Sequence, residues 1–234
     1  MNTDTLFSIP FAEPAVFLSR PNRFLLLAET ASGETVEVHV PDPGRLKELL
    51  YERNNLLIIP AGGENSPRRT KWSLIAAEDS TGWILVNTSF HRTIATSLFS
   101  GLHSPLPFAH KLQAEVRSPS GKSRFDFLLN DEIWVEVKGC TLKIGKEALF
   151  PDAPTTRGLK HLEELTELAL QGKEAAVVFL VFVRDVDHFT ANRKTDPAFA
   201  SALDKAIPAG VKVYPVQLSF DGIDIEYRGL LNHL

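Results

Sequence analysis

The 234-residue sequence has one cysteine, no long hydrophobic run and no excess of basic residues. With Cys140 as its only cysteine, the chain can form neither an internal disulfide framework nor a cysteine-rich zinc site. The longest apolar stretch, AAVVFLVFV at 175–183, has about half of the ~20 residues that a membrane-spanning helix needs. These absences exclude a disulfide-stapled secreted domain and a helical membrane protein, and they favour a protein of the reducing cytoplasm.

Two further absences concern targeting and charge. The N-terminal stretch MNTDTLFSIPF has no basic segment followed by an apolar core, so we expect no secretory signal there. The formal net charge is −4, from 25 Lys and Arg against 29 Asp and Glu. A protein that only coats DNA is usually basic, because neutralising phosphates supplies much of the affinity. A nuclease is not excluded, since its metal-binding carboxylates are neutralised when the ions bind.

The chain begins with a β-rich part, residues 1–86. Short apolar or alternating segments are separated there by turn-forming stretches rich in Pro, Gly, Asn and Ser. They predict a small five-stranded barrel of the kind that often binds nucleic acid on one face. The segments are AVFLSR, RFLLLAET, ETVEVHV, NLLIIPA and WSLIAAE. A short helix is expected at GRLKELLYE, residues 44–52.

Residues 87–234 mix helical and strand patterns, which predicts a second domain of α/β type. The leucines at 162, 165 and 168 follow helical spacing, and Asp196 before Pro197 is typical of a helix start. Helices are expected at 91–102, 155–172 and 196–207, and strands at 113–118, 175–183 and 211–220, with a hairpin at 123–139.

The hairpin segment, SRFDFLLNDEIWVEVKG, carries charged residues inside two apolar runs. Glu136 and Lys138 are two residues apart and therefore share a face of their strand. Asp126 lies on the partner strand, opposite or diagonal to Glu136, within reach of a shared ion. Two such carboxylates suit a hard cation such as Mg²⁺, and Lys138 could orient a water or stabilise developing charge. Glu115, on the preceding strand, is a further candidate acid.

The same charges also have a structural interpretation, because strands commonly turn salt-bridged side chains toward solvent. Arg157 and Lys160 favour the functional one, since basic side chains at the start of a helix are typical of a phosphate site. In the first domain, basic residues near turns and near Trp72 suit contact with a nucleic-acid backbone. The candidate nucleic-acid-binding residues are Arg20, Arg23, Arg45, Arg68, Arg69, Lys71, Arg157 and Lys160.

Asp126 followed by Glu136-x-Lys138 on adjacent strands resembles the catalytic signature of restriction-endonuclease-like nucleases. More narrowly, stretches along nearly the whole chain are similar to the sugar fermentation stimulation protein A family. They are RPNRF, HVPDPGRL, LVNT, SRFDFLL, VEVKGCTL, FPDAPTTRGLKHLEEL and TDPAFASAL. The resemblance implies an N-terminal OB-like barrel, a C-terminal restriction-endonuclease-like α/β domain, DNA binding and a link to the regulation of sugar metabolism. It also implies that Asp126 and Glu136 are metal ligands and that Lys138 is the catalytic lysine.

The first interpretation is therefore a Mg²⁺- or Mn²⁺-dependent phosphodiesterase acting on DNA. A DNA-binding regulator of sugar-metabolism genes that does not cut is the alternative, and an RNA-processing enzyme is a third, since OB barrels also bind RNA. We expect a cytoplasmic protein with no membrane partner. Strand preference and oligomeric state are left open by the sequence, with a homodimer among the options.

Overall fold

A computed structural model of the chain describes residues 4–42, 44–61 and 70–233. The chain forms two compact units. The first comprises residues 1–90 together with 219–226, and the second comprises residues 91–218 together with 227–234. The predicted order is confirmed: an N-terminal OB-type barrel is followed by a C-terminal α/β domain. The two units are described separately below.

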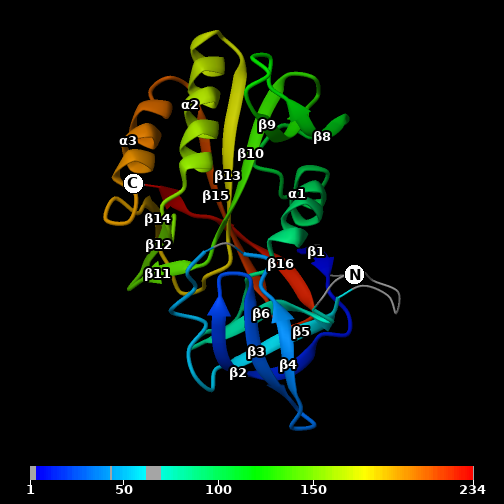
Figure 1. Cartoon of the computed structure of the whole chain (residues 1–234). Coiled ribbons are helices and arrows are strands. Elements are labelled where there is room, and N and C mark those ends of the chain that lie inside the picture. The colour runs from blue at the N-terminus through cyan, green and yellow to red at the C-terminus, as the bar shows by residue number, and fades with distance from the viewer. Residues whose placement is uncertain (1–3, 43, 62–69, 234) are drawn as a thin grey trace. The chain divides into compact units, whose positions relative to one another are not determined.

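Five strands of the first unit form a closed barrel (Figure 1). They are β2 (Glu13–Asn22), β3 (Leu25–Thr30), β4 (Thr35–His39), β5 (Asn55–Pro60) and β6 (Trp72–Asp79). Neighbouring strands are antiparallel in the order β4-β3-β2-β5-β6, and β4 closes the barrel by pairing in parallel with β6. Burial alternates along β2, β3 and β4, as the sequence pattern predicts, whereas β5 and β6 carry continuous runs of buried residues.

The prediction of a helix at residues 44–52 is wrong. Leu46 has a left-handed backbone, with φ of 48°, which L-residues rarely adopt inside a helix. The segment makes a single turn in which the N–H groups of Leu49 and Leu50 both donate to the carbonyl of Leu46. All three leucines are buried, so their helix-like spacing reflects burial of this turn.

The rest of the first unit consists of short elements and a returning part of the chain. The elements are β1 (Thr5–Ser8), β7 (Gly82–Leu85) and the 3₁₀ turn Thr88–Phe90. β7 pairs with β6, and β1 pairs with the first residues of β16 (Asp224–Leu230). Residues 219–226 therefore belong to the first unit although they come from the C-terminal part of the sequence.

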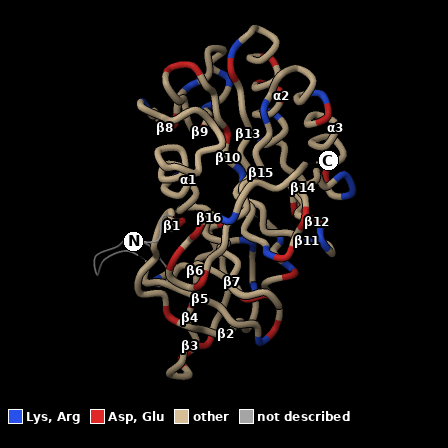
Figure 2. Tube along the Cα trace, turned by 180° about the vertical axis from the view of Figure 1, so that it is seen from behind, with Lys and Arg blue, Asp and Glu red and all other residues tan. Residues whose placement is uncertain are grey.

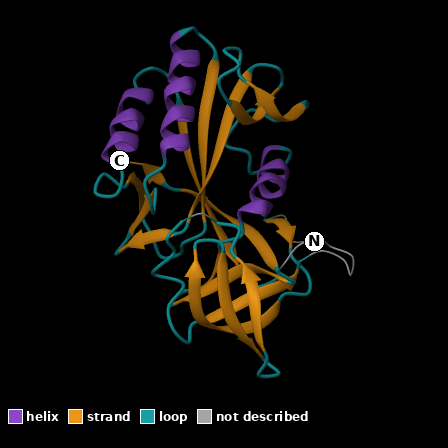
Figure 3. Cartoon of the chain, in the orientation of Figure 1, coloured by secondary structure: helices purple, strands orange, loops and turns teal. Residues whose placement is uncertain are grey.

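The second unit is built on a five-stranded mixed sheet in the order β8-β9-β10-β13-β15 (Figure 3). The strands are β8 (Leu112–Arg117), β9 (Arg124–Leu129), β10 (Ile133–Cys140), β13 (Glu174–Val181) and β15 (Lys212–Phe220). The hairpin β9–β10 is antiparallel, whereas β13 runs parallel to both β10 and β15. Seven of the eight residues of β13 are buried, as expected for a central strand without alternation.

Three helices accompany this sheet. They are α1 (His91–Phe99), α2 (Thr156–Leu170) and α3 (Pro197–Ala206). α2 packs on β13 and lies beside α3, and α1 contacts β10 (Figure 1). Asp196 caps α3 by accepting from the N–H of Phe199, which confirms the predicted start. Across the described residues, no helix is both long and apolar enough to cross a membrane.

A second, small sheet completes this unit in the order β11-β12-β14-β17. Its strands are β11 (Leu142–Ile144), β12 (Glu147–Phe150), β14 (His188–Ala191) and β17 (Asn232–His233). Cys140, at the end of β10, is buried beside it and its thiol donates to the carbonyl of Leu149. Burial raises the pKa of this thiol, so a buried structural role fits it better than that of a nucleophile.

Candidate functional site

The hairpin β9–β10 brings Asp126 and Glu136 to the facing positions just beyond its last paired residues. Its turn uses the left-handed backbones of Asn130 and Asp131, with φ of 55° and 61°, which these two residue types tolerate best. The paired residues run from Leu129 with Ile133 to Phe127 with Val135. The next pair in this register is Asp126 with Glu136, so the turn and the two-residue period of the strands bring the carboxylates together.

Asp126 is anchored by the backbone of the neighbouring strand. The N–H of Val137 donates to Oδ2 of Asp126 at 2.7 Å. The carboxylate therefore takes a backbone donor of β10 just beyond the last pair of the ladder. This bond fixes the side chain beside Glu136 and leaves Oδ1 for another partner.

Glu136 is almost completely buried, with 3% of its surface exposed. Its Oε1 accepts from the ammonium of Lys138, which lies on the same face of β10, and from Nδ1 of His161 at 2.5 Å. Its Oε2 is buried and has no hydrogen-bond partner among the described residues. A buried carboxylate oxygen without a partner is costly, so Oε2 is suited to a ligand that the polypeptide does not supply.

The two carboxyl groups have different acidities. Burial, and next the charge of Glu136, raise the pKa of Asp126 from 3.8 to about 6. Burial also acts to raise the pKa of Glu136, but Lys138 and His161 outweigh it and hold that pKa below its ordinary value. Glu136 is thus the stronger acid of the pair, and ionisation of Asp126 is opposed by burial and by its neighbour.

These observations fit a divalent cation between Asp126 and Glu136. Such an ion would give Oε2 of Glu136 a partner and would relieve the repulsion that raises the pKa of Asp126. Carboxylate oxygens are also the ligand type that hard cations prefer. No set of three or more His, Cys, Asp or Glu side chains gathers as a metal site in the described part of the chain. Water and a substrate oxygen would therefore have to complete the coordination, as is common for Mg²⁺.

Glu115 lies on β8 and is held by arginines. Its carboxylate accepts from Arg92 and lies 3.8 Å from Nη1 of Arg124. Its charge is also a weak contributor to the raised pKa of Asp126. The structure therefore brings Glu115 into the neighbourhood of the pair with its carboxylate already paired, and its catalytic role stays a prediction.

His161 was the residue whose role the sequence did not reveal. Its ring packs edge-on against Phe125 with 5.8 Å between centroids, and it is buried while bonding Glu136. A signal was present, because His161 belongs to the buried stripe of α2. The buried residues of α2 are Gly158, His161, Leu162, Glu164, Leu165 and Leu168. A polar residue on the apolar stripe of a helix needs a buried partner, and Glu136 is that partner.

His91 was a second unforeseen neighbour of the site. Its ring stacks on Phe182 at 5.6 Å and lies against Gly139, where an added Cβ would approach the ring to 2.3 Å. Burial, followed by the charge of Lys138, lowers the pKa of His91 to about 4. Gly139 therefore provides the space in which this neutral ring packs beside β10.

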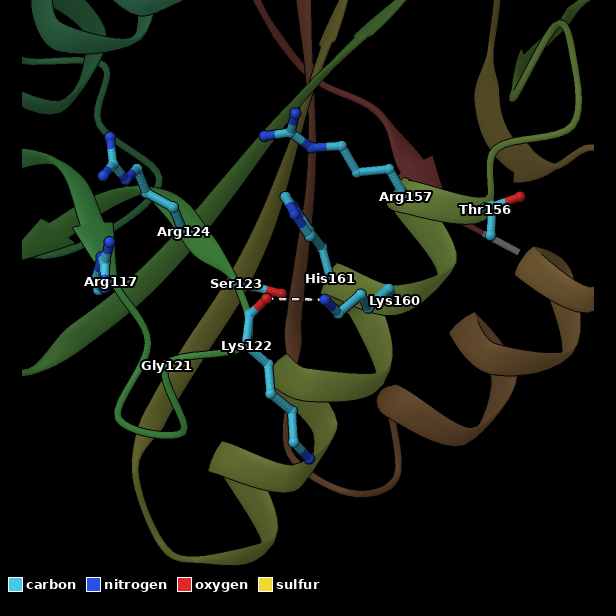
Figure 4. Close-up of a pocket in the computed structure, with 9 residues that line it drawn as sticks. All are labelled: Arg117, Gly121, Lys122, Ser123, Arg124, Thr156, Arg157, Lys160 and His161. Atoms are coloured by element: carbon cyan, nitrogen blue, oxygen red, sulfur yellow. Dashed lines mark hydrogen bonds between the residues drawn. The ribbon is translucent and has the colours of Figure 1, made fainter.

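Arg157 and Lys160 project from the first turns of α2, whose N-cap Thr155 accepts from the N–H of Gly158 at 3.1 Å. Both line a pocket of about 660 Å³ together with His161 (Figure 4). The ammonium of Lys160 donates to the carbonyl of Lys122 at 2.8 Å. Because His161 bonds Glu136 and also lines this pocket, the pocket adjoins the carboxylate pair.

The barrel brings Arg20, Arg23 and Arg45 together around a second pocket, of about 340 Å³, which Lys47 also lines. Arg20 donates to the backbone carbonyls of Arg23 and of Gly44, at 2.7 and 3.0 Å. Its guanidinium therefore joins the two loops that carry the other cations. Phe24, beside Arg23, keeps 51% of its surface exposed and was not singled out from the sequence, although an exposed aromatic next to cations suits base stacking.

The remaining basic candidates precede β6. Lys71 is exposed, and its carbonyl accepts from the N–H of Ala61 at 2.7 Å. Arg68 and Arg69 lie outside the described residues. Their predicted contact with nucleic acid stays a prediction.

Comparison with known proteins finds similarity to a single protein family along nearly the whole chain. Residues 18–86 match the family profile "SfsA N-terminal OB domain", and residues 85–223 match "Sugar fermentation stimulation protein RE domain". A sugar fermentation stimulation protein homolog of Methanococcoides burtonii is 42% identical over 239 residues, covering 99% of this chain and 96% of the relative. A homolog of Thermosipho melanesiensis is 41% identical and covers 95% of each chain.

A solved structure supports the same assignment. It is that of Pyrococcus furiosus SfsA in complex with Ca²⁺, which superposes with a TM-score of 0.88 at 29% identity and covers 98% of this chain and 99% of that protein. Two adjoining family profiles, relatives above 40% identity and a matching structure agree. The chain therefore belongs to the sugar fermentation stimulation protein family.

Proposed function

We propose that this protein is a divalent-metal-dependent phosphodiesterase that cuts DNA. The observation that carries the proposal is the close approach of Asp126 to Glu136 just beyond the paired part of the hairpin, where Asp126 accepts from the N–H of Val137 and Lys138 donates to Glu136. This is the juxtaposition of two acids and a lysine that the sequence pattern predicted. The matching P. furiosus structure contains Ca²⁺, which supports a divalent cation in this family.

Asp126 and Glu136 would hold the ion, which we take to be Mg²⁺ or Mn²⁺ in the active protein. A bound divalent ion polarises a phosphoryl oxygen and lowers the pKa of a coordinated water. The protein's own contribution is to hold the two carboxylates rigidly. The N–H of Val137 fixes Asp126, and His161 fixes Glu136. Preorganised ligands of this kind bind the ion without reordering the site.

Lys138 is the residue to which we assign the chemistry. Its side chain is 18% exposed, and its ammonium lies beside Oε1 of Glu136. A cation in that position can orient the attacking water and stabilise the negative charge that develops on phosphorus oxygens in the transition state. Because this charge is absent in the bound substrate, Lys138 should contribute to turnover much more than to binding.

DNA would contact both units through cations. In the second unit these are Arg157 and Lys160, beside the carboxylate pair, and in the first unit they are Arg23 and Arg45, with Arg20 holding their loops together. Such contacts act on phosphates and make binding depend on salt rather than on sequence. Arg68, Arg69 and Lys71 would extend the barrel surface.

A DNA-binding regulator that does not cut is the second candidate. It is favoured by one observation: among the described residues, the pair lacks a third acidic or histidine ligand at metal-binding positions. A regulator would use the same basic residues to bind DNA but would not need Lys138. The two candidates are therefore separated by whether the wild-type protein cuts DNA in the presence of the metal.

The test uses purified protein with labelled single- and double-stranded DNA and RNA, in EDTA, Mg²⁺ or Mn²⁺. Cleavage that requires the metal is expected for wild type. Lys138→Ala should retain Mn²⁺ and DNA binding but cut slower by about a hundredfold or more. Asp126→Asn and Glu136→Gln should each weaken Mn²⁺ binding at least tenfold, about 1.4 kcal/mol, in calorimetric titration.

Lys111→Ala is the matched control, because Lys111 lies near the same hairpin and pairs with the exposed Asp131. It should cut at the wild-type rate. If wild type binds DNA but cuts no substrate with either metal, the regulator takes the place of the nuclease. Cleavage of RNA alone would transfer the assignment to RNA processing.

A further inference from the structure

The pocket beside the carboxylate pair has a lining of one charge sign. It lies between the loop that joins β8 to β9 and the first turns of α2 (Figure 4). Its cations are Arg117, Lys122, Arg124, Arg157 and Lys160, and no Asp or Glu is among the described residues that line it. Of these cations, the sequence analysis predicts nucleic-acid contacts only for Arg157 and Lys160.

Three of these cations have no counter-ion. The charged groups of Arg117, Lys122 and Arg157 make no ion pair with any other residue that the structure describes. All three are exposed at the rim of the pocket. The other two are only partly engaged, since Arg124 lies 3.8 Å from Glu115 and Lys160 donates to a backbone carbonyl.

The charge of the whole chain does not account for this cluster. The formal net charge is −4, and Lys and Arg elsewhere along the trace are interspersed with Asp and Glu (Figure 2). Gathering like charges without counter-ions is unfavourable by itself, and it creates a local positive potential that attracts anions. The pocket is therefore arranged for an anionic ligand.

The donor geometry and the position favour a phosphate group. Guanidinium groups bind phosphate oxygens through paired N–H bonds, and ammonium groups add point charge. The first residue of α2, Thr156, also lines the pocket, so the positively polarised end of this helix lies near it. His161 forms part of the pocket wall and holds Glu136, so a phosphate bound here lies next to the carboxylate pair without occupying it.

We propose that this pocket is a second phosphate-binding site for the nucleic-acid strand, which holds a phosphate other than the one at the carboxylate pair. Its position relative to the cleaved bond rests on the proposed nuclease function, but phosphate binding itself does not. The phosphate is either a terminal monoester or an internal diester of the strand. Both kinds of phosphate would bind the same cations, but they differ in charge. A monoester carries close to two negative charges at neutral pH, whereas a diester carries one.

The experiment compares two triple variants of the full chain. Arg117→Ala with Lys122→Ala and Arg157→Ala removes the unpaired cations of the pocket. Lys173→Ala with Lys194→Ala and Lys212→Ala removes the same charge from exposed positions of the same unit that do not line it. The control therefore separates pocket binding from the effect of net charge. Thermal unfolding of both variants verifies that each is folded.

Binding is measured by fluorescence anisotropy in EDTA, where no metal-dependent cleavage occurs. The probes are 12-nucleotide DNA strands and duplexes that carry 5′-phosphate, 3′-phosphate or hydroxyl ends. The pocket variant should lose at least tenfold in affinity, and the control variant less than threefold. For the duplex, the slope of log affinity against log salt should become shallower by about 0.9 per lost phosphate contact.

The ends of the strand identify the source of the phosphate. A loss confined to strands with a terminal phosphate assigns the pocket to a monoester, and an equal loss for all ends assigns it to an internal diester. Equal affinities of the two triple variants, or no binding of any strand by wild type, overturn the phosphate site. If wild type cuts nothing with Mn²⁺ while the pocket variant still loses affinity, the nuclease proposal fails and the phosphate site stands.

Discussion

Replacing Asp126 with asparagine is expected to stabilise the metal-free protein at neutral pH. Burial, and then the neighbouring Glu136 carboxylate, raise the pKa of Asp126 from 3.8 to about 6. Asparagine has the same shape and keeps an oxygen that accepts from the N–H of Val137, now at 2.7 Å. The substitution therefore removes an unfavourable buried charge and preserves the hydrogen bond.

The magnitude follows from the difference between the two pKa values. One pKa unit corresponds to about 1.4 kcal/mol. A change from 3.8 to about 6 means that ionising Asp126 at pH 8 lowers the free energy of unfolding by up to about 3 kcal/mol. Because the pKa is raised on folding, this cost is absent below pH 3.8, increases through the window up to about pH 6 and is constant above it. The gain from the asparagine variant should thus be full at pH 8 and about half at pH 5.

The assay is urea unfolding in EDTA, followed by tryptophan fluorescence at pH 8 and pH 5. Asp131→Asn is the matched control, because it removes a carboxylate from the exposed turn of the same hairpin, where Lys111 pairs with it at 2.8 Å. The control should change the free energy of unfolding by less than about 1 kcal/mol. An Asp126→Asn variant that is no more stable than wild type at pH 8, or whose gain does not shrink at pH 5, would refute the reasoning.

Three further substitutions test the packing around the site. Gly139→Ala should lower the free energy of unfolding by about 1 to 3 kcal/mol in urea titration, because the new Cβ would lie 2.3 Å from Cε1 of His91. Adding His91→Ala should restore part of this loss. If the double variant is no more stable than Gly139→Ala, the contact with His91 is not the cause. His161→Ala should destabilise by about 1.5 to 3 kcal/mol, since the buried Glu136 loses a donor, and it should weaken Mn²⁺ binding in calorimetry, whereas His161→Asn should recover part of both. Asp196→Ala should lower the free energy of unfolding by about 2 kcal/mol or more, which exceeds the ~1 kcal/mol of a simple N-cap. The reason is that its carboxylate accepts from the N–H of Phe199 in α3 and also from the N–H of Thr155 just before α2. An unchanged thermal midpoint would contradict this.

The sequence alone determined the positions of the barrel strands and which side chains of the hairpin share one face. Alternation of apolar and polar residues has the two-residue period of a strand, and turn-forming residues mark where each strand ends. For the same reason the opposition of Asp126 and Glu136 could be predicted. The structure pairs Leu129 with Ile133 and so leaves residues 130–132 in the turn. Counting outward from this three-residue turn brings Asp126 opposite Glu136, whereas a two-residue turn at Asn130 and Asp131 would have brought it opposite Val135. These are local properties, because neighbours in the sequence create them.

The incorrect helix at residues 44–52 shows where local pattern misleads. Leu46, Leu49 and Leu50 have helical spacing, and all three are buried. A single turn buries them equally well, and the left-handed backbone of Leu46 ends any regular helix there. Apolar spacing reports which side chains are buried, whereas the backbone conformation is decided by the surrounding packing.

Only the tertiary structure decided which distant residues complete the site. His161 reaches Glu136 from a helix 25 positions further along the chain, and His91 packs on Gly139 from a helix that precedes it. The cations of the basic pocket likewise come from β8, β9 and the loop between them, and from α2. Residues 219–226 return to the first unit, although their sequence resembles any other strand segment. Such contacts depend on how helices pack on the sheet and on the path of the chain between elements, and neither of these leaves a periodic signal in the sequence.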